Sequence, residues 1–342
     1  MTETRSYLET ATNESLTSLV FTDPVEVLAP RLGAPYARYR DLWARAGSRR
    51  DLRLGFPLHL DTDLIDACNL RCTFCLENNE SRSLARLPLD LLDAVLDEAN
   101  HHPDYYSLNL GTAAETLYDP GYFLEGLEVI ERRPRPIDLF VHTNALNLTM
   151  EVSKAILGSR VTWLCVSIEG VTDKAYRAMR GVGLERPRAN LLKFLEERGR
   201  RGARLPIVRL SMVVSPHNVN ERQEFLDFWR DKVDMVEFQD LQTTPDMAAA
   251  LAVSAKPSNC ADPWRRLLLG VDGSVFPCCA FPMFRDPLRL GHVRDGIGNI
   301  WTGDRLAALR RSLISGEFKG HPSCRACAGS RFKPDEEMKD VP

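Results

Sequence analysis

The sequence has no long apolar run and little net charge. Its apolar stretches stay well below the roughly 18–20 residues of a membrane-spanning helix. The N-terminal segment, residues 1–30, carries acidic side chains in place of the apolar centre of a signal peptide. The net charge of −3 gives no reason to expect a basic surface for nucleic acid. We therefore expect a cytoplasmic protein that binds neither a membrane nor nucleic acid.

Cysteine, in contrast, is plentiful, with nine residues in the chain. A reducing compartment does not favour a disulfide framework, so these cysteines need another explanation. All but one of them fall into two groups, one near residue 70 and one between residues 260 and 327. This grouping indicates bound metal.

The middle of the chain alternates strand-like runs with helical patterns. Six runs rich in β-branched and aromatic residues predict strands; they are Pro57–Ile65, Tyr106–Leu110, Asp138–His142, Trp163–Ile168, Ile207–Val214 and Met235–Leu241. Helical periodicity lies between them. Strands and helices that alternate in this way predict an α/β fold with a parallel sheet, here an open, partial (β/α)6 barrel. Its site is expected at the carboxyl ends of the strands.

The chain divides into four expected segments. Residues 1–55 form a helical lead-in, residues 56–242 the partial barrel, residues 243–330 a smaller metal-binding domain, and residues 331–342 a frayed tail. The smaller domain begins with a short hairpin around the turn Asp272–Gly273 and contains a helix over Asp304–Ile314.

The first cysteine group follows the first predicted strand directly. Cys68, Cys72 and Cys75 have the spacing C-x3-C-x2-C. Three thiolates on one loop can hold three irons of a [4Fe–4S] cluster, which leaves the fourth iron open for a small molecule. The alternative is a zinc site that lacks its fourth ligand. The spacing and the position after a strand favour the cluster.

This motif resembles that of the radical S-adenosylmethionine (SAM) superfamily, and the resemblance runs from about Phe56 to Gly329. It implies that the open iron binds SAM and that an electron, supplied by a flavodoxin or ferredoxin, splits it. The resulting 5′-deoxyadenosyl radical removes hydrogen from an unactivated C–H bond. The cofactor supplies the chemistry, and the protein positions one substrate hydrogen against it.

The resemblance also implies a set of SAM contacts at successive strand ends. Gly111–Glu115 resembles a glycine-rich segment but lacks its second glycine, and Ala145 stands where a threonine–asparagine–glycine segment has glycine. Glu115 is expected to receive the SAM ammonium, and Arg180 to pair with its carboxylate through a charge-assisted fork. The expected contacts are Glu115, Thr143, Asn144, Ser167, Glu169 and Arg180.

The second cysteine group resembles Twitch, a shortened form of the SPASM auxiliary-cluster domain. Cys260, Cys278, Cys324 and Cys327 are its four expected ligands and would hold a second [4Fe–4S] cluster. Four thiolates also suit structural zinc, which is the alternative. The remaining Cys165 lies inside a predicted strand and is expected to be a small core residue.

Cys279 directly follows one of these ligands and is a candidate hydrogen-atom donor, although it is equally expected to serve only in packing. Twitch enzymes include aminocyclitol dehydrogenases and sugar epimerases of antibiotic biosynthesis. We therefore expect a sugar, oligosaccharide or aminocyclitol substrate and epimerisation with Cys279 as the donor. The alternatives are oxidation of a secondary alcohol with the auxiliary cluster as electron acceptor, modification of a peptide, and a non-catalytic electron carrier.

Overall fold

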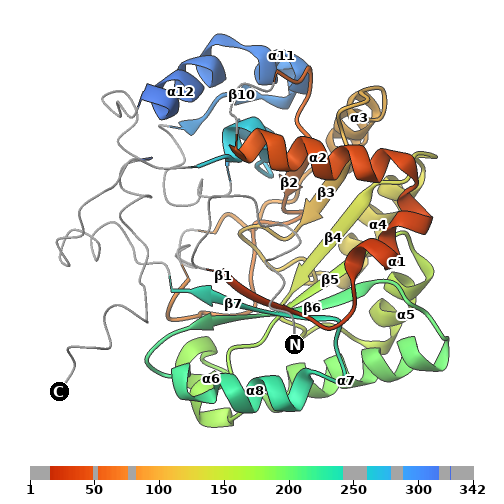
Figure 1. Ribbon diagram of the computed structural model, residues 1–342, viewed down its shortest axis with the longest axis vertical. Coiled ribbons are helices and arrows are strands. Elements are labelled where there is room, and N and C mark those ends of the chain that lie inside the picture. Colours follow the sequence, from red (N-terminus) through yellow and green to blue (C-terminus); the bar gives the residue numbers. More distant parts are fainter. Residues whose placement is uncertain are drawn as a thin grey trace.

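The computed structural model describes residues 16–48, 53–75, 82–241, 260–278, 288–315 and 324. Its described strands form one sheet in the order β1-β7-β6-β5-β4-β3-β2-β8-β9-β10 (Figure 1). The six strands β2 to β7 are parallel neighbours and coincide with the six predicted runs. Their bounds are β2 His59–Thr62, β3 Ser107–Leu110, β4 Asp138–Thr143, β5 Trp163–Ser167, β6 Ile207–Val214 and β7 Met235–Asp240. This confirms the predicted partial barrel.

Helices connect these parallel strands and cover the outer face of the sheet (Figure 1). They are α3 Leu89–Asn100, α4 Pro120–Glu131, α5 Met150–Gly158, α6 Asp173–Arg180, α7 Glu185–Arg200 and α8 Arg222–Trp229. Asp119, Thr149 and Thr172 begin α4, α5 and α6 by accepting a backbone N–H of the first turn. None of the described helices is long and apolar enough to cross a membrane.

Alternate residues of each strand face opposite sides of the sheet. On β4, Leu139 and Val141 pack in the large apolar core beneath the helices, whereas Phe140 joins a separate cluster on the inner face. The same alternation separates Leu164 from Trp163 on β5. The inner face can therefore carry a different chemistry from the outer one.

The lead-in closes the inner face at the amino ends of the strands. It contains α1 Pro24–Leu32 and α2 Ala34–Ser48, together with a strand, β1 Leu16–Val20, in a segment expected to be only helical. β1 pairs antiparallel with β7 and so covers an edge that would otherwise leave backbone groups unpaired. From α2, Tyr39 stacks on Tyr106 with ring centres 5.4 Å apart, and Trp43 meets the ring of His59 edge-on. We call this aromatic cluster the floor.

The C-terminal segment continues the same sheet. β8 Arg266–Leu269 runs parallel to β2, and β9 Ser274–Phe276 and β10 Gly291–His292 follow in antiparallel order. The predicted turn joins β8 to β9, with Gly273 at a positive φ of 80°. The predicted helix is present as α12 Asp304–Ser315, preceded by α11 Ile297–Thr302.

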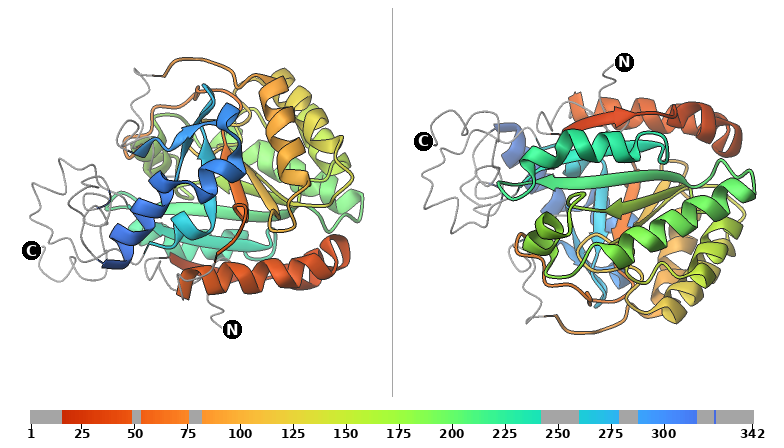
Figure 2. Two further views of the ribbon diagram at one scale, coloured as in Figure 1. Left: turned by 90° about the horizontal axis from the view of Figure 1, so that it is seen from above. Right: turned by 90° about the horizontal axis from the view of Figure 1, so that it is seen from below.

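One carboxylate connects this segment to the barrel helices. Glu98 of α3 accepts the backbone N–H groups of Ile297 and Gly298, both at 2.9 Å. A carboxylate at this position satisfies two N–H groups that the first turn of α11 leaves without helical partners. In the C-terminal segment, α11 accordingly lies next to α3, and α12 follows on the other side of α11 (Figure 2).

Replacing Trp43 by alanine tests the floor. Trp43 is buried, and its ring lies under the guanidinium groups of Arg265 and Arg266, at 4.9 and 5.5 Å. The Trp43→Ala variant should lose about 3–5 kcal/mol of unfolding free energy, because the cavity cannot refill. Urea denaturation followed by circular dichroism measures this loss. Ile314→Ala, at an exposed position, is the control; equal stability of both variants would show that α2 does not close the barrel.

Candidate functional site

The first cysteine group lies on the loop after β2, at the carboxyl end of the sheet, as the sequence predicted. Cys68 and Cys72 are half-buried, Cys75 is exposed, and all three are free thiols. Thr73 fixes this loop to the end of α6, because its N–H donates to the Met179 carbonyl at 2.9 Å. The loop is thus held between two elements of the barrel.

Two donors point at the sulfur atoms of this loop. The N–H of Leu70 lies 3.4 Å from Sγ of Cys68, and Nη1 of Arg180 lies 3.3 Å from Sγ of Cys72. Burial raises the pKa of Cys72 to about 11, and Arg180 acts against this shift. Donors of this kind stabilise thiolates and tune the clusters that thiolates bind.

The described residues contain no group of three or more metal-binding side chains around one point that would hold a single ion. A cubane cluster takes each thiol at a different iron and does not require such convergence. The donor set and its hydrogen bonds fit a [4Fe–4S] cluster with three protein ligands.

Glu115, Thr143 and Asn144 come together beside this loop. The carboxylate of Glu115 accepts hydrogen bonds from the Thr143 hydroxyl at 2.5 Å and from the N–H groups of Asn144 and Leu117 at 2.8 and 3.0 Å. Burial raises its pKa, and these donors oppose that shift. The Asn144 amide also donates to the side-chain oxygen of Asn69 at 2.7 Å. One hydrogen-bonded chain thus joins three of the expected SAM contacts to the cysteine loop.

Asp63 shapes the segment that carries Glu115, and sequence analysis did not single it out. Its buried carboxylate accepts the N–H groups of Thr112, Ala113 and Ala114 at 2.8–3.2 Å. Burial raises its pKa to about 6 against these three bonds. Gly111 begins the segment at a φ of 93°, so a single glycine supports the turn where the resembled motif has two.

Ala145 also departs from the expected motif and carries a backbone cost. It has a φ of 62°, in the left-handed region that favours glycine. Its N–H donates to the Thr143 hydroxyl at 3.0 Å, and its side chain is fully buried. The backbone at Ala145 therefore adopts the left-handed conformation that favours glycine, although the residue is alanine.

Arg180 and Glu169 form a buried ion pair above Cys72. Nη2 of Arg180 lies 2.7 Å from Oε1 of Glu169, and Nε bonds its other oxygen. Burial alone would lower the pKa of Arg180, but Glu169 raises it well above the usual value. The same guanidinium lies 5.3 Å from the ring centre of Phe74. Ser167 is not part of this cluster; its hydroxyl lies 3.5 Å from that of Ser211.

The second cysteine group lies partly within the described residues. Cys278 and Cys324 both pack against the apolar cluster of Leu268, Phe276 and Leu288. Ala113, two residues before Glu115, packs against the same apolar cluster, so this group borders the segment expected to contact SAM. The third predicted ligand, Cys260, is half-buried at the start of the segment. The other two predicted residues, Cys279 and Cys327, lie outside the described residues.

Charged and polar side chains line the inner face above the floor, which sequence analysis missed. The Asp61 carboxylate accepts from His59, Asn109 and Arg266 at 3.1, 2.8 and 3.3 Å. Burial raises the pKa of Asp61, but His59 and Arg266 outweigh it and hold the pKa below its usual range. Such burial of charge is tolerated only with this full set of partners.

A buried ion pair between β6 and β7 also lies on the inner face. Nε of Arg209 lies 3.3 Å from Oε2 of Glu237, and both side chains are buried. Cys165 lies opposite Arg209 in the register and is buried in the apolar cluster of the inner face, which confirms the predicted small core residue. Its pKa is raised to about 11 by burial.

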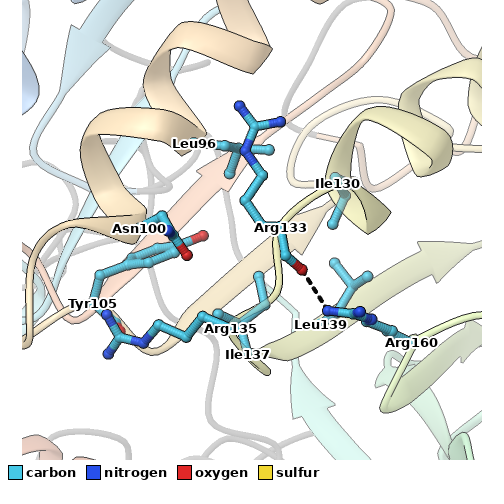
Figure 3. Close-up of a pocket in the computed structure, with 9 residues that line it drawn as sticks. All are labelled: Leu96, Asn100, Tyr105, Ile130, Arg133, Arg135, Ile137, Leu139 and Arg160. Carbon is cyan, nitrogen blue, oxygen red and sulfur yellow. Dashed lines mark hydrogen bonds between the residues drawn. The ribbon is translucent and has the colours of Figure 1, made fainter.

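A narrow cleft lies away from this site, between α3, α4 and the amino ends of the strands (Figure 3). Three arginines line it, and their side chains are used in structural bonds. Arg135 donates to the carbonyls of His102 and Tyr105, both at 2.6 Å, and Arg160 donates to the carbonyl of Arg133. The cleft therefore contributes packing and not chemistry.

Family models match two segments of the chain. Residues 63–228 match the radical SAM superfamily, and residues 260–328 match SPASM, an iron–sulfur cluster-binding domain. The chain is 25% identical over 172 residues to the mycofactocin maturase MftC of Mycobacterium ulcerans and to that of Mycobacterium tuberculosis. This similarity covers 50% of the chain and 44% and 41% of those proteins. The chain thus spans less than half the length of these relatives.

Solved structures share the fold at low identity. SuiB of Streptococcus suis bound to SAM superposes with a TM-score of 0.56 at 17% identity, over 79% of this chain and 71% of that one. Native anSMEcpe with bound SAM gives a TM-score of 0.56 at 15% identity, over 80% and 89%. BtrN in complex with SAM and 2-DOIA gives 0.51 at 14% identity, over 81% and 93%. At these identities the likeness supports the fold alone.

Replacing Ala145 by glycine should stabilise the protein. A left-handed conformation costs an L-residue about 1–2 kcal/mol, and the added freedom of glycine in the unfolded chain offsets about half of that. We expect Ala145→Gly to raise the unfolding free energy by about 0.5–1 kcal/mol. Urea denaturation measures it, with Ala94→Gly, in the middle of α3, as the control that loses about 1 kcal/mol. A loss of similar size in both variants would contradict the strain at Ala145.

Proposed function

We propose that this chain, which matches the radical SAM superfamily over residues 63–228 and SPASM over residues 260–328, is a radical SAM enzyme. Its proposed substrate is a small hydroxylated molecule, a sugar, oligosaccharide or aminocyclitol, from one carbon of which it removes hydrogen. The observation that carries this proposal is the polar inner face. Its side chains offer hydrogen bonds at the level where the barrel opens toward the cysteine loop. The floor formed by α2 closes this face at the amino ends of the strands, which suits a compact substrate.

The chain's own residues hold and orient the cofactors. Cys68, Cys72 and Cys75 would bind the [4Fe–4S] cluster. When bound, the cluster and SAM supply a carbon-centred radical that takes hydrogen from a C–H bond. Glu115, fixed by three donors, presents a carboxylate of defined direction to the SAM ammonium. A group held this firmly loses little entropy on binding, which is how enzymes position reactants.

The auxiliary site belongs to the same proposal. Cys260, Cys278, Cys324 and Cys327 would hold one further [4Fe–4S] cluster, as in Twitch, which makes two clusters in all. Cys278 and Cys324 pack against the same apolar side chains as Ala113. This packing supports a position of the auxiliary iron–sulfur cluster next to the expected SAM contacts. A flavodoxin or ferredoxin is the reductant we propose.

Two outcomes follow hydrogen removal, and we favour epimerisation. In epimerisation, the thiol of Cys279 returns a hydrogen atom to the opposite face of the substrate carbon, and the proposed flavodoxin or ferredoxin supplies the electron that, with a proton, restores the thiol. The position of its sequence neighbour Cys278 beside the SAM-contact segment supports this role. Oxidation of a secondary alcohol is the alternative. A base would then take the hydroxyl proton of the substrate radical, and the auxiliary cysteines would hold a cluster able to accept its electron.

Peptide modification is the second candidate function. MftC is named a maturase of mycofactocin, and a further SuiB structure, with a TM-score of 0.57 at 16% identity, is described as bound to the precursor peptide SuiA. The precursor peptide in the SuiB complex favours a peptide substrate. The polar inner face favours the small molecule, for which the BtrN complex with 2-DOIA is the parallel.

Cysteine substitutions test the cluster assignment. Cys72→Ser should abolish 5′-deoxyadenosine formation and remove the electron paramagnetic resonance (EPR) signal that shifts when SAM is added, because one iron loses its thiolate. The signal of the auxiliary cluster should remain. Cys165→Ser is the matched control and should keep the SAM-sensitive signal. If Cys72→Ser also keeps it, the cluster is bound elsewhere.

Substrate class and outcome can be tested together in deuterated water. Reduced enzyme and SAM are incubated with glucosamine, 2-deoxystreptamine or myo-inositol, and with a cysteine-containing peptide. We expect a hydroxylated compound to raise 5′-deoxyadenosine formation and the product to carry solvent deuterium at an inverted carbon. Cys279→Ala should block this incorporation. A product with two hydrogens fewer identifies the dehydrogenase, and stimulation by the peptide alone identifies the peptide modifier.

A further inference from the structure

We infer that His142 and Asn109 are substrate-recognition residues, which bind O–H or N–H groups of the substrate on the inner face of the barrel. This inference rests on the proposed function and names the groups that select its substrate. Neither residue belongs to the cysteine loop or to the chain of hydrogen bonds around Glu115.

His142 lies on the inner face, one step above the floor. Its neighbours in β4, Val141 and Phe140, define the two faces: Val141 packs in the outer core and Phe140 in the floor. His142 shares the face of Phe140 because side chains alternate along a strand. It lies opposite Cys165 of β5 in the register. It is half-buried, so its ring remains within reach of a ligand.

His142 also borders the expected SAM contacts. Thr143 and Asn144 follow it directly and bind the Glu115 carboxylate. A methyl group added at Gly111 would lie 3.1 Å from Cβ of His142, so the segment that carries Glu115 begins against this residue. A substrate group held by His142 would therefore lie next to the SAM contacts, where hydrogen removal must occur.

The ring of His142 has no hydrogen-bond partner within the described part of the chain. This is unusual among its neighbours, because His59, Asp61 and Arg266 are all engaged with one another. Neutral imidazole offers one donor and one acceptor nitrogen. A half-buried ring whose nitrogens bind no protein group is free to bind a ligand.

The surrounding charges keep this ring neutral. Burial, reinforced by the nearby Arg209, lowers the pKa of His142 to about 3. His59 and Arg266 act in the same direction, and only Asp61 opposes them. Because Asp61 already pairs with His59 and Arg266, and Glu237 pairs with Arg209, no carboxylate of this group compensates a charge on His142. The ring therefore retains its acceptor nitrogen at neutral pH.

Asn109 supplies a second acceptor from the neighbouring strand. Its amide nitrogen donates to Asp61, but its Oδ1 is buried without a partner among the described residues. An unsatisfied buried carbonyl costs about 1–3 kcal/mol, so a ligand that donates to it would restore this energy. β3 and β4 are adjacent, and Asn109 lies opposite Phe140 in the register, one step below His142.

These two acceptors select a class of substrate. A molecule with hydroxyl or amino groups on neighbouring carbons can donate to both residues and also accept from the second nitrogen of His142. A sugar or aminocyclitol has this pattern, whereas an apolar side chain would leave both acceptors unsatisfied. A site of this kind rejects analogues that lack the donor.

Substitutions of His142 test the inference in the reconstituted holoenzyme with SAM. The probe is whichever of glucosamine, 2-deoxystreptamine and myo-inositol stimulates 5′-deoxyadenosine formation. His142→Phe keeps an aromatic ring but removes both nitrogens. KM for the probe should then rise about three- to tenfold, which is the loss of affinity expected when one or two neutral hydrogen bonds are removed. His142→Gln keeps an acceptor and should restore part of the affinity. His101→Gln, at an exposed position, should match the unaltered enzyme.

A spectroscopic measurement adds a readout that does not depend on turnover. In oxidised, SAM-bound holoenzyme, the imidazole ¹⁵N signals of His142 should report a neutral ring at pH 5 and should shift when the probe is added. His142→Gln assigns the signals. Loss of the SAM-sensitive EPR signal identifies a misfolded variant. In that case the NMR titration of the unaltered enzyme with the probe tests the inference.

The outcomes separate the inference from the proposed function. If no hydroxylated probe stimulates 5′-deoxyadenosine formation, the proposed substrate class fails, and the inference fails with it. If a probe is active but KM is unchanged in His142→Phe, or if its ¹⁵N signals do not move with the probe, the inference alone is overturned. A raised KM with partial rescue by glutamine supports it.

Discussion

The buried carboxylate of Glu115 holds the site together. A carboxylate in this environment requires several donors, and it finds them in two segments: Leu117 from its own segment, and Thr143 and Asn144 at the end of β4. The side chain of Asn144 also donates to Asn69 and so fixes the position of the cysteine loop relative to Glu115. The turn before Glu115, held by Asp63, and the left-handed Ala145 both serve to direct this carboxylate. The loop after β2 and the ends of β3 and β4 therefore act as one unit.

The strands and most helices could be predicted because their apolar patterns report burial directly. Strand β1 could not, since five residues near the chain start pair only because β7 offers an open edge. The charged inner face was missed for a related reason. Its members, such as Asp61, Arg209 and Glu237, lie singly among apolar residues, and each looks unremarkable in its own strand. One signal for this polar face was available in the sequence: polar residues recur at every second position of strands that were expected to be buried on both sides.

The candidate site was predictable to the extent that it depends on spacing. The three cysteines occupy one loop, and Glu115, Thr143 and Asn144 meet as the order of strand ends implied. Asp63 and Asn69 were not predictable, because their roles arise from contacts between segments. Arg180 was expected to bind SAM; here its guanidinium joins Glu169 to Cys72, and the sequence does not encode that geometry locally. Pairing of this kind couples the cysteine loop to the ends of β5 and α6.

The floor has a consequence for how such an enzyme changes during evolution. Two of its aromatic side chains, Tyr39 and Trp43, come from α2, which lies outside the repeating strand–helix units that carry the cysteine loop and the expected SAM contacts. Substitutions in α2 can change the floor without altering the strand register or the direction of Glu115. Under the proposed function, substrate size and radical chemistry would be encoded by separate stretches of the gene, and selection could adjust the first while the second stays intact.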